Sequence, residues 1–153
     1  MDKPTNYCNS CQKPTLKSPR ILIVEDEGVI AALIGGAASQ AGLEYHIALT
    51  YDEAIRLLDT HEYHILWLDI LLDNKHSGWE VIKHCILKEK FDGKLIICTG
   101  LYPDIPVTHK EILELSRKWF SSIYLFPKPF DLTDALALLT EYCNGCTACE
   151  KVN

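Results

Sequence analysis

Five short apolar segments recur along the chain, each separated from the next by a longer segment of mixed polarity. They cover residues 21–24, 45–49, 64–72, 94–98 and 123–126. Several are apolar throughout instead of alternating, which is typical of parallel strands covered on both faces. The pattern therefore predicts five strands that alternate with helices, arranged as a doubly wound α/β fold with right-handed crossovers.

Helix start signals stand between these strands. Three pairs have the spacing of a capping box: Thr50 with Glu53, Ser77 with Glu80, and Thr108 with Glu111. Asp131 is a suitable cap for the last helix.

The first helix, expected over about 28–41, is unusual because Gly35 and Gly36 stand among alanines. Each glycine costs roughly 1 kcal/mol relative to alanine in a helix. Close packing of this helix on the sheet is one explanation, and a small-residue surface for a partner's helix is the other.

Polar residues follow four of the predicted strands. The first strand is followed by Glu25 and Asp26, the third contains Asp69, the fourth is followed by Thr99, and the fifth by Lys128. Ligands of doubly wound sheets bind where the strands have their carboxyl ends. Clustered carboxylates repel one another unless a cation joins them, and hard oxygen ligands favour Mg²⁺. A lysine and a hydroxyl beside them would suit a phosphoryl group.

Asp69 lies within an apolar strand, where an ionised carboxylate is costly without partners. Taken alone, Asp69 is better explained as a structural aspartate, but four strands each supply a compatible group. We therefore predict that Asp69 is a nucleophile that accepts phosphate as an acyl phosphate. Asp26, with Glu25 through water, is predicted to hold Mg²⁺.

These motifs resemble the receiver domain of bacterial two-component response regulators. The acidic pair lies in ILIVEDE, the phosphoacceptor in LDILL, the switch threonine in ICTG and the lysine in PKPF. Successive landmarks are 43, 30 and 29 residues apart. The resemblance implies a flavodoxin-like (βα)5 domain over 20–143, with a five-stranded parallel sheet of order 2-1-3-4-5. Cysteine-containing tails would cover 1–19 and 144–153.

The resemblance also implies how such a domain works. A histidine kinase or phosphotransfer protein donates the phosphoryl group to Asp69, while the backbone carbonyl of Leu71 joins the Mg²⁺ ligands. The Lys128–Pro129 bond would be cis. The threonine hydroxyl then moves toward the phosphate, an aromatic residue turns inward, and the face formed by the fourth helix, fifth strand and fifth helix is remodelled.

The chain is accordingly expected to be a stand-alone response regulator, because no output domain follows residue 153. It would be a phosphoacceptor and not an enzyme, and it would act by binding a downstream protein that the sequence does not identify. A homodimer through the remodelled face is an open alternative.

Four features depart from the family pattern. The loop after Asp69 has Asp73 where proline is usual and reaches Gly78 one residue late, and the stretch between Thr99 and Lys128 is several residues longer than usual. Leu125 stands where the switch aromatic is expected, so either Tyr124 replaces it through a bulge or this coupling is absent. Leu71 and Leu101 stand at the positions that flank the path of the hydrolytic water in that family, and both are apolar, which predicts a long-lived phosphorylated form.

Composition and charge limit the classes of partner and the cellular location that are expected for this chain. The chain has 153 residues, 48% of them hydrophobic and 24% charged, with a net charge of −6, as in an ordinary single globular domain. The only basic cluster is Lys13, Lys17 and Arg20, so nucleic-acid binding is not expected. The longest uncharged run, 28–43, is too short and glycine-rich to span a membrane, and no signal peptide is evident. The expected location is the cytoplasm.

Five cysteines lie outside the receiver pattern: Cys8, Cys11, Cys143, Cys146 and Cys149. The predicted fold brings both tails to the sheet edge opposite Asp69, where two C-x2-C pairs would suit tetrahedral Zn²⁺. A redox-active thiol set, an iron–sulfur cluster and no function are the alternatives. Cys85 and Cys98 lie in apolar stretches and are expected in the core.

Two rival functions remain. In one, a cysteine cluster on the termini senses a metal or a redox change and the receiver fold is only a scaffold. In the other, the chain is a phosphohydrolase of the haloacid dehalogenase type. That chemistry needs an acid two residues after the nucleophile, where this chain has Leu71.

Overall fold

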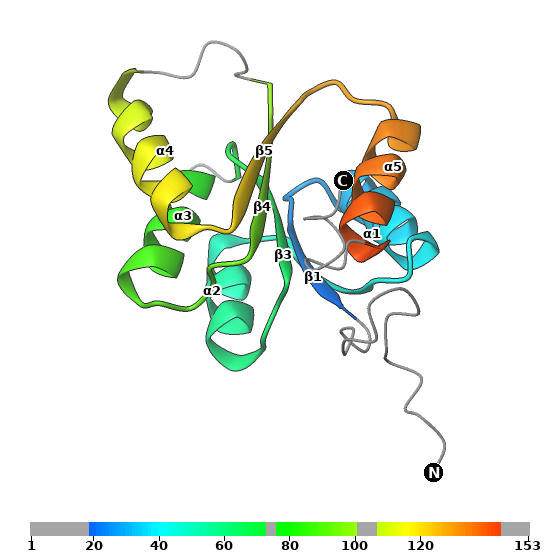
Figure 1. Cartoon of the computed structure of the whole chain (residues 1–153), viewed down its shortest axis with the longest axis horizontal. Coiled ribbons are helices and arrows are strands. Elements are labelled where there is room, and N and C mark those ends of the chain that lie inside the picture. Colours follow the sequence, from blue (N-terminus) through cyan, green and yellow to red (C-terminus); the bar gives the residue numbers. More distant parts are fainter. Residues whose placement is uncertain (1–18, 73–75, 101–106, 145–153) are drawn as a thin grey trace, which may run out of the picture.

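A five-stranded parallel sheet forms the centre of the protein in the computed structural model, which describes residues 19–72, 76–100 and 107–144. The strands are β1 (Arg20–Val24), β2 (Glu44–Ala48), β3 (Ile65–Asp69), β4 (Lys94–Thr99) and β5 (Ser122–Pro127). Their order is β2-β1-β3-β4-β5 (Figure 1). The α/β fold and this strand order confirm the predictions. The third strand is shorter than its apolar segment, because the chain leaves the sheet after Asp69.

Five helices alternate with the strands among the described residues: α1 (Gly28–Gln40), α2 (Tyr51–Thr60), α3 (Gly78–Leu87), α4 (Val107–Trp119) and α5 (Leu132–Asn144). Figure 1 shows α1 and α5 over one face of the sheet and α2, α3 and α4 over the other. Two buried apolar clusters correspond to these two layers. The sheet is therefore covered on both faces, which is why its central strands are apolar throughout.

Side chains cap three of the helices near the predicted places. The Thr50 hydroxyl accepts a hydrogen bond from the Glu53 N–H at 3.2 Å, and the Glu80 carboxylate accepts one from the Ser77 N–H at 3.2 Å. The Asp131 carboxylate accepts one from the Thr133 N–H at 3.0 Å. Helix α4, however, begins at Val107, so Thr108 lies inside the helix and not at its cap.

Gly35 and Gly36, in the middle of α1, have different surroundings. A Cβ on Gly35 would come within 2.7 Å of the Tyr45 ring on β2, whereas a Cβ on Gly36 would meet nothing within 4 Å. Close packing against the sheet therefore explains Gly35. Gly36 faces open space, and no contact among the described residues requires it.

The end of α5 lies at the amino edge of the sheet. The Lys94 ammonium at the start of β4 stands 4.5 Å from the centre of the Tyr142 ring in the last turn of α5. The backbone N–H of Lys94 bonds to His64, whose own N–H bonds to Arg20 at the start of β1. Residues 20 and 142 thus lie at the same edge of the sheet. The predicted convergence of the two tails is confirmed for the chain up to these residues.

Of the five cysteines predicted to bind a metal, Cys8, Cys11, Cys146 and Cys149 lie outside the described residues, as does the side chain of Cys143. Cys85 and Cys98 are buried and free, as predicted, and burial raises the pKa of each thiol to about 12. Among the described helices, none combines the length and the apolar character that crossing a membrane requires.

Candidate functional site

Three acidic side chains meet at the carboxyl edge of the sheet. Glu25 and Asp26 follow β1, and Asp69 is the last residue of the neighbouring strand β3. One carboxylate oxygen from each lies within 4.8 Å of the others. Asp26 is exposed, whereas Glu25 and Asp69 are buried. The parallel pairing of β1 with β3 therefore produces a compact set of oxygen donors with one side open to solvent.

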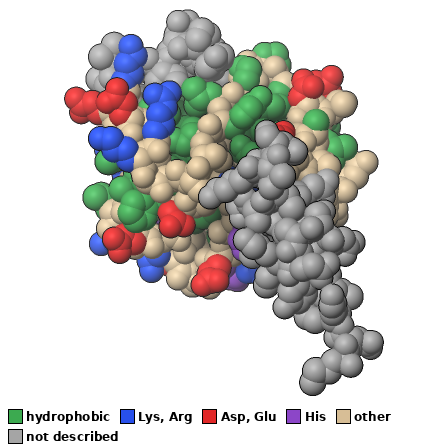
Figure 2. Space-filling model, in the orientation of Figure 1, with side chains coloured by type: hydrophobic (Ala, Val, Ile, Leu, Met, Phe, Trp, Pro, Cys, Tyr) green, Lys and Arg blue, Asp and Glu red, His purple; other side chains and the backbone are tan. Residues whose placement is uncertain are grey.

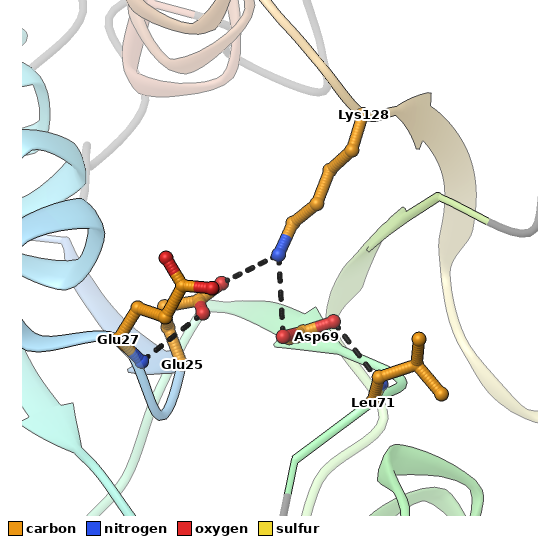
Figure 3. Close-up of polar contacts among 5 residues, drawn as sticks. All are labelled: Glu25, Glu27, Asp69, Leu71 and Lys128. Carbon is orange, nitrogen blue, oxygen red and sulfur yellow. Dashed lines mark hydrogen bonds and ion pairs between the residues drawn. The ribbon is translucent and has the colours of Figure 1, made fainter.

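Lys128 reaches into this cluster from the chain just after β5. Its ammonium lies 3.1 Å from Glu25 Oε2 and 3.2 Å from Asp69 Oδ2 (Figure 3). The Lys128–Pro129 peptide bond is cis, as the resemblance implied. A single cation thus bridges two buried carboxylates that would otherwise repel each other.

Burial governs the protonation of the two carboxyl groups. Burial and the negative charge of Asp69 together raise the pKa of Glu25 from 4.5 to about 7, although Lys128 opposes this shift. Burial also raises the pKa of Asp69, again against the effect of Lys128. For Lys128 itself, burial favours the neutral amine, but the charges of Asp69 and Glu25 prevail and raise its pKa. Burial therefore favours the neutral form of both carboxyl groups, and Lys128 opposes this by favouring their charged forms.

Backbone N–H groups orient the same carboxylates. The Leu71 N–H donates to Asp69 Oδ1 at 3.1 Å, and the Glu27 N–H donates to Glu25 Oε1 at 3.3 Å (Figure 3). The Leu71 residue itself is 60% exposed. The Leu71 N–H therefore binds one carboxylate oxygen of Asp69, and Lys128 binds the other. The neighbouring side chain on the solvent side is the apolar Leu71.

Gly78 packs against the backbone that carries Asp69. A Cβ at this position would collide with the Asp69 carbonyl oxygen and would come within 2.9 Å of Ile70 Cα. The Gly78 N–H donates to the Ile70 carbonyl at 2.8 Å, and an isolated antiparallel bridge joins Leu71 to Ser77. Glycine is needed here because α3 begins in contact with the end of β3.

We expect Gly78→Ala to destabilise the protein by roughly 2–4 kcal/mol, because the new methyl group must displace main chain and not a flexible side chain. Gly36→Ala is the matched control and is expected to stabilise by about 0.5–1 kcal/mol, since its methyl group enters open space on a helix. Urea unfolding of the two variants measures both effects. Equal effects of the same sign would contradict the assigned packing of Gly78.

Thr99 is the last residue of β4, and its backbone pairs with Pro127, next to Lys128. The fourth strand thus ends at the same edge as the acidic cluster. The Thr99 side chain, Asp73 and Leu101 lie outside the described residues.

The pairing of β4 with β5 shows whether Tyr124 or Leu125 stands at the position of the switch aromatic. The register runs without interruption from Ile96–Tyr124 through Ile97–Leu125 to Thr99–Pro127. No bulge places Tyr124 where the family has its aromatic. Leu125 packs against the layer of α2, α3 and α4, whereas Tyr124 is 44% exposed on the other face, next to Phe126.

Sequence reasoning missed two features of this site. The first is the ion pair between Glu25 and Lys128, because Glu25 was expected to act on Mg²⁺ through water. The second is an aromatic cluster behind the site, in which Trp67, two residues before Asp69, packs against Phe126 and Phe130. The PKPF motif contains Phe130 and LWL contains Trp67, but only the fold shows that they touch.

The donor set fits a hard divalent cation. Three carboxylates supply oxygen ligands within a short distance of one another. The exposed Asp26 leaves an approach from solvent. These residues therefore have the character of a Mg²⁺ site, in which Lys128 would remain as the second source of positive charge.

The sequence matches no family model. Solved structures of receiver domains resemble this structure over most of the chain. A response regulator receiver domain protein from Methanospirillum hungatei is 22% identical, with a TM-score of 0.66 over 90% of this chain and 100% of that one. TrrA from Thermotoga maritima, solved with Mg²⁺ and beryllium fluoride, is 27% identical, with a TM-score of 0.57 over 79% and 98%. CheY4 of Vibrio cholerae is 16% identical, with a TM-score of 0.67 over 82% and 99%. The chain has the fold of a receiver domain.

Proposed function

We propose that this chain, whose fold is that of response regulator receiver domains, is a phosphorylatable receiver that takes a phosphoryl group onto Asp69. The observation that carries the proposal is the bridging of Asp69 and Glu25 by Lys128, beside the exposed carboxylate of Asp26. Burial of a charged triad at a sheet edge is costly, and phosphoryl transfer supplies a chemical reason for it.

The reaction is a group transfer. A carboxylate oxygen of Asp69 attacks phosphorus, the new O–P bond forms, and the bond from phosphorus to the donor breaks. The Lys128 ammonium would bind oxygens of the transferred phosphoryl group, since it already contacts the Asp69 carboxylate. Asp26, Glu25 and the Leu71 carbonyl would hold Mg²⁺, which offsets negative charge when bound. The Leu71 N–H keeps the Asp69 carboxylate oriented.

This chemistry ends with a phosphorylated protein and not with turnover of a separate substrate. A haloacid dehalogenase-type hydrolase would need an acid at the position of Leu71, which is apolar and exposed. The natural donor would be a histidine kinase or a phosphotransfer protein, and the output would be binding to another protein. We further propose that the receiver spans 20–143, that the cysteine-containing tails are separate from it, and that the chain acts in the cytoplasm.

Acetyl phosphate tests the phosphoacceptor role without knowledge of the natural donor. With Mg²⁺, intact-mass spectrometry is expected to detect one added phosphoryl group, and with EDTA in place of Mg²⁺ it is expected to detect none. Modification that is equally fast in EDTA would contradict the proposal. Native mass spectrometry of the same sample tests the predicted zinc on the terminal cysteines.

We expect the phosphorylated form to be long-lived, with a half-life of minutes or more, because the Leu71 side chain cannot orient a water molecule for attack. Leu71→Asn is expected to shorten this half-life. Leu87→Asn, which changes an exposed leucine on α3, is the control and is expected to have no effect. The time course of the phosphorylated mass after removal of the donor measures both. A wild-type half-life of seconds would refute the expectation.

The sensor alternative differs from the phosphoacceptor proposal in the substitutions that it expects to abolish signalling. If the fold were only a scaffold for a cysteine cluster, Asp69→Asn would leave signalling intact, and substitution of Cys8 or Cys146 would abolish it.

A further inference from the structure

Two helices begin close to the end of β3. Helix α2 starts at Tyr51 and α3 at Gly78, and a helix that follows a parallel strand starts at the carboxyl edge of the sheet. Both helices lie over the same face of the sheet and contact each other (Figure 1). The residues at their starts therefore lie at the same edge as Asp69.

Tyr51 and His76 join these two helix starts. Their rings stack, with centres 4.2 Å apart and planes inclined by 21°. His76 Nδ1 lies 2.9 Å from Glu80 Oε2, and it is the donor because a carboxylate can only accept. Tyr51 in turn packs against the buried cluster beneath α2, α3 and α4. The Tyr51–His76–Glu80 cluster thus connects the start of α3 to the core through α2.

The same glutamate oxygen connects this cluster to the backbone of Leu71. Glu80 Oε2 also accepts a hydrogen bond from the Ser77 N–H at 3.2 Å, and Ser77 forms the isolated antiparallel bridge with Leu71. The Leu71 N–H donates to Asp69 Oδ1, and the carbonyl of the same residue is the proposed backbone ligand of Mg²⁺. A continuous series of contacts therefore leads from the Tyr51 ring to the residue that would supply this ligand.

The segment between β3 and α3 lacks the residue type that restricts a loop most. Residues 70–77 contain no proline, whose ring would fix the backbone, and the segment is one residue longer than in the receiver pattern. A flexible segment loses conformational entropy when its carbonyl binds a metal ion, whereas a segment that is already held in place loses less. Contacts that hold His76 and Ser77 would therefore raise the affinity for the ion.

We propose that His76 is a positioning residue for Mg²⁺. Through its stack on Tyr51 and its hydrogen bond to Glu80, it holds the segment between β3 and α3 so that the Leu71 backbone stays in place as a ligand. This inference rests on the proposed function, because it concerns the metal ion of the same site. It goes beyond that function by assigning part of the affinity for Mg²⁺ to side chains that do not bind the ion.

A second contact between α2 and α3 provides the matched control. His84 Nε2, in the last turn of α3, lies 2.8 Å from Asp59 Oδ1, near the end of α2. The same chemical groups thus join the same two helices, but at the helix ends that point away from the carboxyl edge of the sheet. Loss of helix packing would follow substitution of either histidine, whereas loss of Mg²⁺ affinity should follow only substitution of His76.

Urea unfolding of the full-length protein at several Mg²⁺ concentrations and constant ionic strength measures both effects. The free energy of unfolding in EDTA reports packing, and its rise with Mg²⁺ gives the Kd of the ion. This rise reports the acidic site, because Glu25, Asp26 and Asp69 form the only group of three potential metal ligands among the described residues. In Figure 2 acidic side chains over α4 are interspersed with lysine and arginine, and a surface of mixed charge attracts Mg²⁺ only weakly.

His76→Ala is expected to raise the Kd of Mg²⁺ about five-fold, which is less than the roughly 10- to 100-fold cost of losing a group bonded directly to a metal ligand. His84→Ala is expected to lower the free energy of unfolding in EDTA but to leave the Kd unchanged. A Kd that is unchanged in His76→Ala, or raised as much in His84→Ala, would overturn the proposal.

Substitutions of Tyr51 test whether the stacked rings act together. Tyr51→Ala is expected to raise the Kd about three-fold, as the loss of one stacked ring pair allows, and Tyr51→Phe to leave it unchanged because the ring remains. The double variant Tyr51→Ala/His76→Ala should bind Mg²⁺ no more weakly than His76→Ala alone. Effects that multiply in the double variant would show that the two rings act independently and would overturn the proposal.

The wild-type titration separates this inference from the proposed function. A wild type whose stability does not respond to Mg²⁺ would refute the proposed function and, with it, the role of His76. A wild type that binds the ion, together with a His76→Ala variant that binds it equally well, would refute the role of His76 alone.

Discussion

Replacement of Lys128 by methionine is expected to slow phosphoryl uptake from acetyl phosphate by roughly 10²- to 10³-fold, the usual cost of losing one preorganised donor in a transition state. The Lys128 ammonium is already 3.2 Å from Asp69 Oδ2 and is largely shielded from water, so no solvent molecule can replace its charge at low cost. Methionine keeps most of the aliphatic volume of lysine. The initial rate of appearance of the phosphorylated mass, with saturating Mg²⁺, measures the effect.

Lys110→Met on α4 is the matched control, because this lysine is exposed and does not belong to the acidic cluster or to its ion pairs. Its rate should equal that of the wild type. If Lys128→Met were also as fast as the wild type, Lys128 would have only a structural role and the proposed chemistry would lose its electrophilic group.

Glu25→Gln is expected to stabilise the fold in EDTA at pH 8 by on the order of 2 kcal/mol. The pKa of Glu25 is raised to about 7 by burial and by Asp69, above its usual value of 4.5. Below pH 4.5 the carboxyl group is protonated in both the folded and the unfolded chain. Between pH 4.5 and 7 the unfolded chain releases its proton first, so the wild type loses stability as the pH rises. The glutamine variant has no proton to lose at this position, and its advantage should vanish near pH 4.

Addition of Mg²⁺ should reverse this order. The wild type gains RT ln(1 + [Mg²⁺]/Kd), or about 2.7 kcal/mol at a hundred-fold excess over Kd, whereas the variant binds the ion more weakly. Glu27→Gln controls for the loss of one negative charge, because Glu27 is exposed and only its backbone N–H contacts Glu25. Urea titrations at pH 4 and pH 8, with EDTA or Mg²⁺, give all of these free energies. A Glu25→Gln variant that is less stable than the wild type in EDTA at pH 8 would contradict the account of the buried charge.

The fold was predictable because its signals are local and repeated. Apolar segments such as 21–24 and 94–98 have the composition of strands buried on both faces, and Thr50 and Asp131 cap the helices that follow β2 and β5. The convergence of Asp26, Asp69 and Lys128 also followed from the sequence, because parallel strands bring their carboxyl ends to one edge. Where the third strand ends was not predictable, because Ile70 and Leu72 remain buried after the chain has left the sheet.

Pairwise contacts between distant residues account for what the sequence left open. The partner of Glu25 is 103 residues away, and nothing in either local sequence selects Lys128 over a water molecule. Whether Tyr124 or Leu125 faces α4 depended on a one-residue register that composition cannot specify. The structure settles it through the continuous pairing of β4 with β5.

Identification of the modified residue tests the central claim most directly. Borohydride reduces an aspartyl phosphate to homoserine, so peptide mapping after treatment with acetyl phosphate, Mg²⁺ and then borohydride reports which side chain received the phosphoryl group. We predict homoserine at position 69 alone, and none in Asp69→Asn. Homoserine at position 26, or an unmodified chain in the presence of Mg²⁺, would contradict the assignment of Asp69 as the phosphoacceptor.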